Sequence, residues 1–180
     1  MSTTKDTEVD ILEIDVEVIT SRLKKLGAKK VFEGRIDSIY FDFRNKSLDK
    51  ECKLLRLRKK GDKCTITLKQ NAAGGNDAKE EYDVTVADFE NARILIEHLG
   101  LVECQTDSRE RICYKLLNSD VNINLYDNIP PFLEVKSQSD QELKEILKLL
   151  GFSMSKVTCR SEKEVVAHYE HVFPTTTRMP

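Results

Sequence analysis

Two short segments of the chain carry arginines at alternate positions. Arg56 and Arg58 lie in the run LLRLRKK, and Arg109 and Arg111 lie in SRERICYK. Because side chains alternate across a β-strand, each pair would share one face, with apolar neighbours on the other. A guanidinium group donates paired, planar hydrogen bonds, which suit the oxygens of a phosphate group. The spacing therefore predicts two strands whose charged faces either are solvated or converge on a highly charged ligand.

Carboxylates alternate in the same way in two other segments. In KEEYDVTV, Glu81 and Asp83 share a face with Lys79, and in PFLEVK, Glu134 shares a face with Lys136. A carboxylate repels phosphate, but it can hold a hard cation such as Mg2+ or Mn2+ that bridges to phosphate oxygens. The alternative for any single residue is a solvated surface charge. The clustering of arginines and carboxylates at matching strand positions favours a shared site.

The composition narrows the classes of protein to which the chain could belong. Its 180 residues, 39% hydrophobic and 33% charged, fit one globular domain with a substantial core. The net charge of −2 argues against a broad nucleic-acid-binding face. Five cysteines without CxxC spacing indicate neither a disulfide framework nor a zinc site. No apolar run approaches membrane-spanning length and the N-terminus lacks signal-peptide features, so we expect a cytoplasmic protein without a membrane partner.

Three segments with apolar residues at helical spacing end in the dipeptide Leu-Gly. They cover residues 15–27, 87–100 and 139–151, and each begins near an acidic or hydroxyl residue that suits a helix N-cap. These patterns predict three amphipathic helices. Eight further segments resemble strands, namely 5–14, 35–43, 52–60, 63–70, 79–86, 107–116, 120–127 and 131–137. Residues 60–63 are typical of a hairpin turn, and residues 71–77 of a loop.

Eight mainly antiparallel strands with three helices indicate an α+β fold. Such a sheet is large enough to close into a barrel that is lined by polar side chains and covered outside by amphipathic helices. The alternative is an open sheet whose charged face is solvated. Because the charged residues gather at matching positions, we predict the closed eight-stranded antiparallel β-barrel. It would direct six side chains into one cavity, those of Arg56, Arg58, Arg109, Arg111, Glu81 and Glu134.

The order and spacing of several segments resemble the CYTH superfamily of triphosphate tunnel enzymes, which includes class IV adenylyl cyclases and thiamine or inorganic triphosphatases. The resemblance runs from about Glu8 to about Gly151. It is carried by EVDILEID, a helix ending LGAKK, IDSIYFDF, LLRLRKKGDK, TITLKQ, AKEEYDVTVADFE, LGL, RERICY and IPPFLEVK. It implies a closed tunnel in which basic residues bind a triphosphate and acidic residues hold a divalent metal. We expect one CYTH-like domain over residues 1–173 and a loose tail over 174–180.

The resemblance and the strand pattern together predict the site residues. The expected triphosphate-binding residues are Arg56, Arg58, Lys69, Arg109, Arg111 and Lys136. The expected ligands of Mg2+ or Mn2+ are Glu8, Glu81, Glu134 and Asp127, with Asp6 and Asp83 as weaker candidates. Glu8, Glu134 and Arg58 are expected to take part directly in catalysis.

Two positions depart from the family pattern. The family opens with Glu-x-Glu-x-Lys, where this chain has Asp10 in place of the lysine, and it ends with Glu-Ile-Glu, where this chain has Lys136 in place of the second glutamate. This exchange predicts an ion pair between Asp10 and Lys136 across the tunnel. The family also has an aspartate at a strand end that aligns with either Tyr126 or Asp127, and these neighbours would face opposite ways in a regular strand.

Three functions remain open from the sequence. The first is metal-dependent hydrolysis of a triphosphate, with ATP, thiamine triphosphate and tripolyphosphate as candidate substrates. The second is a class IV adenylyl cyclase that converts ATP to cyclic AMP and pyrophosphate. The third is a module that binds a nucleotide or polyphosphate without catalysis, which the exchange at Asp10 and Lys136 favours. We lean towards an enzyme, which could form a homodimer and has no nucleic-acid partner.

Overall fold

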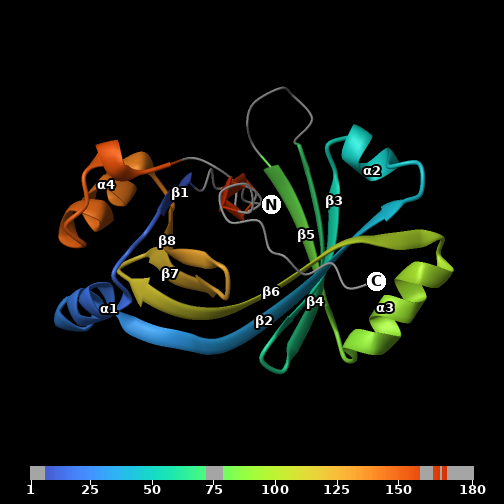
Figure 1. The fold of residues 1–180 in the computed structure, drawn as a ribbon, viewed down its shortest axis with the longest axis horizontal. Helices are drawn as coiled ribbons and strands as arrows, with labels where there is room; N and C mark the ends of the chain where they lie inside the picture. The colour runs from blue at the N-terminus through green and yellow to red at the C-terminus, as the bar shows by residue number, and fades with distance from the viewer. Residues whose placement is uncertain (1–6, 72–78, 159–163, 167, 170–180) are drawn as a thin grey trace. The chain divides into compact units, whose positions relative to one another are not determined.

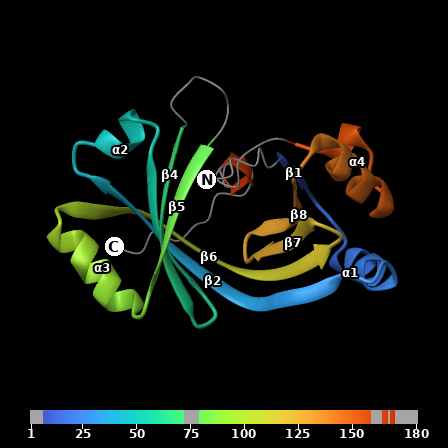
Figure 2. The ribbon, with the colours of Figure 1, turned by 180° about the vertical axis from the view of Figure 1, so that it is seen from behind.

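The computed structural model describes residues 7–71, 79–158, 164–166 and 168–169. The strands are β1 (Thr7–Ile11), β2 (Lys29–Phe43), β3 (Leu54–Lys60), β4 (Lys63–Asn71), β5 (Lys79–Val86), β6 (Leu101–Leu116), β7 (Ser119–Tyr126) and β8 (Ile129–Ser137). The helices are α1 (Val16–Lys25), α2 (Ser47–Lys50), α3 (Phe89–His98) and α4 (Asp140–Leu149), followed by the 3-10 turn η1 (Met154–Lys156). Figures 1 and 2 show these elements from opposite sides.

The eight strands belong to one sheet with the order β1-β8-β7-β6-β2-β3-β4-β5. The pairings β1–β8, β8–β7, β7–β6, β2–β3, β3–β4 and β4–β5 are antiparallel. The eight strands, the three amphipathic helices and the α+β class are therefore confirmed. The strand order ends at β1 and β5, so it does not confirm the predicted closure into a barrel.

The observed strand limits correct several predicted ones. β2 begins at Lys29 and β6 at Leu101, six residues earlier than predicted in each case; both extensions are largely exposed, so they carry little apolar alternation from which to predict them. β1 ends at Ile11 because Glu13 has a φ of 55°, a left-handed conformation that breaks the strand. Cys52 also has a left-handed backbone conformation, with a φ of 53°, and β3 therefore begins only after it.

The chain forms two compact units. One, which we call the central unit, covers Gly34–Ser108, and the other, the terminal unit, covers Ser2–Glu33 with Arg109–Pro180. The predicted loop at 71–77 lies outside the described residues except for Asn71, and so does the predicted tail at 174–180.

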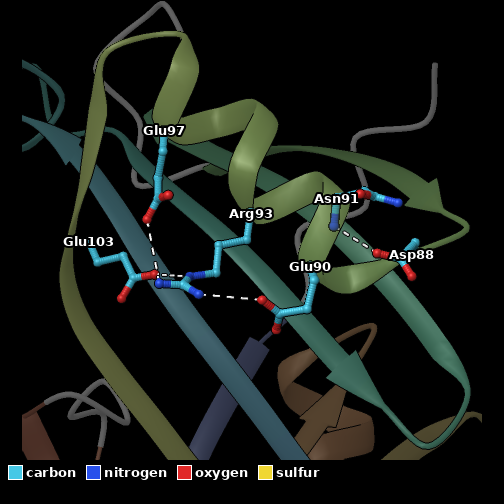
Figure 3. Close-up of polar contacts among 6 residues, drawn as sticks. All are labelled: Asp88, Glu90, Asn91, Arg93, Glu97 and Glu103. Atoms are coloured by element: carbon cyan, nitrogen blue, oxygen red, sulfur yellow. Dashed lines mark hydrogen bonds and ion pairs between the residues drawn. The ribbon is translucent and has the colours of Figure 1, made fainter.

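In the central unit, α3 packs its apolar face on the sheet. Ala92 and Ile96 of α3 are buried in a cluster with Phe41, Leu57 and Leu101. Asp88 caps the helix, because its Oδ1 accepts a hydrogen bond from the backbone N–H of Asn91 at 2.7 Å. Arg93 of α3 pairs with two carboxylates of the same helix, Glu90 and Glu97, and with Glu103 of β6 (Figure 3).

In the terminal unit, α1 and α4 cover the apolar face of β1, β8, β7 and the end of β6 (Figures 1 and 2). Both helices begin with the predicted kind of cap: Asp15 accepts from Val18 N–H and Ser139 from Glu142 N–H. The buried side chains include Leu23 of α1, and on α4 and the sheet Leu143, Ile146, Leu147, Val121, Ile123, Leu133 and Val135. This packing leaves the opposite face of these strands for polar residues.

Described residues beyond α4 pack on β1 and β8 of the terminal unit, a contact that the sequence pattern did not predict. Thr158 forms an isolated antiparallel bridge with Asp10 of β1, with backbone hydrogen bonds of 2.9 and 2.8 Å. Val165 and Tyr169, in short helical stretches, are buried against Phe132 and Ile129. In the described part of the chain, no helix is long and apolar enough to cross a membrane.

Candidate functional site

One face of the sheet in the terminal unit is polar because each of its strands alternates polar and apolar residues. Directly paired residues of neighbouring strands share a face. The register pairs Asp10 with Glu134, Glu134 with Asn122, and Asn124 with Arg111. The apolar partners between them, such as Val135 and Ile123, point into the core under α1 and α4. We call the polar side the polar face of the terminal unit.

Arg111 is held in place by Glu134 and Asn124 on this face, and Glu134 is held in turn by Asn122. Its Nη2 donates to Glu134 Oε2 at 2.9 Å, and its Nε donates to Asn124 Oδ1 at 2.5 Å. Asn122 Nδ2 donates to the other carboxylate oxygen of Glu134 at 2.8 Å. Arg111 and Glu134 are each only 8% exposed, so this is a buried, hydrogen-bonded ion pair. The guanidinium plane is therefore oriented before any ligand binds.

The charge state of Glu134 follows from the same contacts. Burial by itself raises the pKa of this carboxyl, but the charges of Arg111 and Arg109 and the hydrogen bonds from Asn122 and Arg111 outweigh burial, so the pKa lies below its usual value. Glu134 is thus a carboxylate at neutral pH. It offsets part of the positive charge that two buried arginines bring to this face.

Arg109, which is 3% exposed, contacts an aromatic ring on the same face. Its guanidinium carbon lies 5.7 Å from the centre of the Tyr126 ring, within the range of a cation–π interaction. Asp127, by contrast, is exposed in the turn after β7. Of the two neighbours that the sequence left open, Tyr126 is the one in contact with a predicted phosphate-binding residue.

Asp10 and Lys136 both lie on this polar face, but not opposite one another. In the β1–β8 register, Asp10 pairs with Glu134 and Glu8 pairs with Lys136. Asp10 and Lys136 are therefore diagonal neighbours on adjacent strands of one sheet face, and the ion pair between them stays a prediction. Lys136 also pairs in register with Asp120 of β7, so it stands between two acidic positions.

The central unit has a second cluster of charged residues on β3, β4 and β5. Glu81 accepts from Lys69 Nζ at 3.1 Å and lies 4.0 Å from Arg56 Nη2. Arg58 Nε donates to Ser38 Oγ at 3.3 Å, and Thr67 Oγ1 donates to Asp83 Oδ1 at 2.5 Å. The apolar neighbours of the arginines point the other way, with Leu57 fully buried in the core under α3.

The two clusters account for most of the predicted site residues. The central unit brings together Arg56, Lys69 and Glu81, and Arg58 lies two residues after Arg56 on the same strand. The terminal unit brings together Arg111 and Glu134. The same face also carries Arg109, Lys136 and Glu8. Asp127 does not join them, and Asp6 lies outside the described residues.

The predicted metal ligands do not form a ready-made metal site. Among the described residues, no group of three or more His, Cys, Asp or Glu side chains is placed to hold an ion. Both oxygens of Glu134 already accept hydrogen bonds, and Glu81 pairs with two basic residues. The donor set fits only the kind of site in which one or two carboxylates share Mg2+ with substrate phosphates.

Sequence reasoning missed the neutral side chains that position the arginines. Asn122 and Asn124 orient Glu134 and Arg111, and Ser38 contacts Arg58. The signal was present in VNINLY, where two asparagines alternate with buried apolar residues and so must share the polar face.

A sequence model of the family described as the CYTH domain matches residues 9–164, most of the chain. This protein belongs to the CYTH domain family. The match includes all residues of both charged clusters except Glu8, and it ends at the beginning of the helical stretch that packs on Phe132.

The chain is also similar to individual proteins of known sequence or structure. A protein of Methanocaldococcus jannaschii, "Putative adenylate cyclase MJ0240", is 26% identical over 170 residues, 89% of this chain and 97% of the relative. A putative adenylate cyclase of Vibrio parahaemolyticus has a similar structure, with a TM-score of 0.80 and 15% identity over 92% of this chain and 99% of that protein. The Pyrococcus horikoshii protein PH1012 is 26% identical with a TM-score of 0.68, over 88% and 99% of the two chains.

Proposed function

We propose that this CYTH domain binds a triphosphate and hydrolyses it together with Mg2+ or Mn2+. The observation that carries the proposal is the buried Arg111, whose guanidinium is fixed by Glu134 and Asn124 on a polar sheet face. A buried, oriented cation in a family that binds triphosphates is suited to a polyanionic ligand. The closed tunnel that the resemblance implies is part of this proposal.

The basic residues would bind the ligand. In the terminal unit, Arg109, Arg111 and Lys136 would donate hydrogen bonds to phosphate oxygens. The family resemblance implies the same role for Arg56, Arg58 and Lys69 of the central unit. Glu81 and Glu134 hold several of these cations in fixed orientations, so little side-chain entropy is lost when the ligand binds. Arg58 would stabilise the charge that develops on the transferring phosphoryl group.

The carboxylates on the polar face of the terminal unit would hold the divalent cation. Glu134 and Glu8 lie on this face, and Asp10 is buried in register with Glu134. The cation would supply charge neutralisation and orientation of the phosphates. Glu81 would serve mainly as the partner of Arg56 and Lys69.

Two other functions have specific support. An adenylyl cyclase is favoured by the relative from Methanocaldococcus jannaschii, whose name assigns that activity. A binding module without catalysis is favoured by Lys136, because the family pattern has a glutamate at this position. In the structure, Lys136 pairs in register with Glu8.

Product analysis separates the three functions. The purified protein would be incubated with ATP, thiamine triphosphate or tripolyphosphate, each with Mg2+ or Mn2+ and with EDTA as control. Orthophosphate release that disappears with EDTA and in Arg111→Ala, but persists in Lys148→Ala on the exposed side of α4, is the expected result. Cyclic AMP with pyrophosphate would replace the proposal by the cyclase, and binding without any product would replace it by the binding module.

A further inference from the structure

Arg109 on β6 forms one end of a continuous set of aromatic contacts in the terminal unit. Its guanidinium carbon lies 5.7 Å from the centre of the Tyr126 ring. The Tyr126 ring in turn stacks on Phe132, with centroids 6.0 Å apart and planes inclined by 12°. We call these three residues the Arg109 stack.

The far end of the Arg109 stack is buried by the chain after α4. Phe132 is fully buried in a cluster with Ile129, Val165 and Tyr169. Tyr169 is anchored by its hydroxyl group, which donates to Glu13 Oε1 at 2.9 Å. Because Phe132 is enclosed on this side, the Tyr126 ring packs against a rigid surface instead of against solvent.

The pairing of β7 with β8 is irregular at the point where Tyr126 lies. The register shifts between Asn124 and Tyr126, and Tyr126 pairs with Ile129 at the hairpin end. Irregularities of this kind re-aim side chains, and they leave the ring position to side-chain packing more than to the strand ladder. The contacts with Phe132 and Arg109 therefore contribute to the position of the Tyr126 ring.

We infer that Tyr126 is a positioning residue that orients Arg109 for phosphate, with Phe132 as its support. This inference rests on the proposed function, because it assigns Arg109 to the triphosphate. The N–H donors of a guanidinium lie in its own plane, and a ring that packs on its face does not compete with an anion for them. Tyr126 thus orients the guanidinium of Arg109 without taking up its N–H donors.

Two substitutions separate the ring from the hydroxyl group. Tyr126→Phe keeps the aromatic face and should bind tripolyphosphate within about two-fold of the wild type in calorimetric titration. Tyr126→Leu removes the face and should weaken binding by about five-fold or more, the size expected for a partly buried cation–π contact. Tyr126→Met is a second non-aromatic variant, should the leucine variant fail to fold.

A positioning role predicts coupling to Arg109 that a structural role does not. In an Arg109→Ala background, Tyr126→Leu should cause no further loss of affinity, although it should still lower the melting temperature. Equal losses in both backgrounds, or a Tyr126→Leu variant that binds as well as the wild type, would overturn the inference. A wild-type protein that binds none of ATP, thiamine triphosphate and tripolyphosphate would instead overturn the proposed function, so the two failures are distinct.

Discussion

Glu134 on β8 and Arg111 on β6 form a 2.9 Å ion pair across β7, the strand that lies between them in the sheet. β7 takes part in the contact, because Asn122 donates to Glu134 and Asn124 accepts from Arg111. Three strands thus converge on one buried charge pair. Removing one member of such a pair leaves the other charge buried without a partner. The substitution therefore lowers the free energy of unfolding by more than the intact pair contributes to it.

Glu134→Gln should destabilise the protein by about 1.5–3 kcal/mol at pH 7, because it removes a charged hydrogen-bond acceptor. Because the pKa of Glu134 is lowered in the folded state, the ionised carboxylate stabilises the folded protein fully at pH values above the pKa of Glu in the unfolded chain, about 4.3. The contribution is lost as the pH falls below that value and through the folded pKa. Thermal unfolding between pH 3 and 7 should show the difference from wild type shrinking below about pH 4.3.

The matched control for this measurement is Glu145→Gln, on the exposed side of α4. It should leave the pH profile of the wild type almost unchanged. A constant difference between Glu134→Gln and wild type down to pH 3 would show that Glu134 does not titrate as the ion pair requires.

Arg58→Ala and Arg111→Ala should each weaken tripolyphosphate binding roughly ten-fold or more, because a charge-assisted hydrogen bond to an anion contributes about 1.5–3 kcal/mol. Lys24→Ala and Lys148→Ala remove exposed cations on α1 and α4 and should have little effect. Calorimetric titration of the four variants compares them directly. Similar affinities for all four would exclude the two arginines as ligands of the anion.

Glu8 and Lys136 should be coupled energetically, because they are directly paired in the β1–β8 register. A double-mutant cycle with Glu8→Gln and Lys136→Gln, read by chemical denaturation, should give a coupling of about 0.2–1 kcal/mol. The same cycle between Asp10→Asn and Lys136→Gln should give less, since these residues are diagonal neighbours. A larger coupling for Asp10 than for Glu8 would contradict the register.

Asp42→Asn should lower the melting temperature by loosening α2. The Asp42 carboxylate accepts hydrogen bonds from the backbone N–H groups of Phe43, Leu48 and Asp49. Burial by itself raises the pKa of Asp42, but these hydrogen bonds outweigh burial and place the pKa below its usual value, so the side chain keeps its negative charge. The exposed Asp49→Asn is the control in the same thermal unfolding experiment. Equal melting temperatures for the two variants would mean that Asp42 does not anchor α2.

Local patterns in the sequence were sufficient to predict the elements and the faces of the strands. The alternation in LLRLRKK and PFLEVK placed Arg56 and Glu134 opposite the core, and Asp15 and Ser139 marked helix starts. These features depend on neighbours two to four residues apart, whose relation is fixed by strand and helix geometry. The order of the segments was also enough to indicate the CYTH family.

Only the tertiary structure decided which of these residues meet. Arg111 and Glu134 are 23 residues apart and join through the pairing of three strands. Tyr126 rather than Asp127 contacts Arg109, because the β6–β7 register, which pairs Glu110 with Leu125, leads next to Arg109 and Tyr126, while Asp127 lies beyond the end of β7. The pairing of Thr158 with Asp10 joins residues from opposite ends of the chain. Register between distant segments depends on packing of the whole sheet, and a shift by one residue would turn every side chain to the other face.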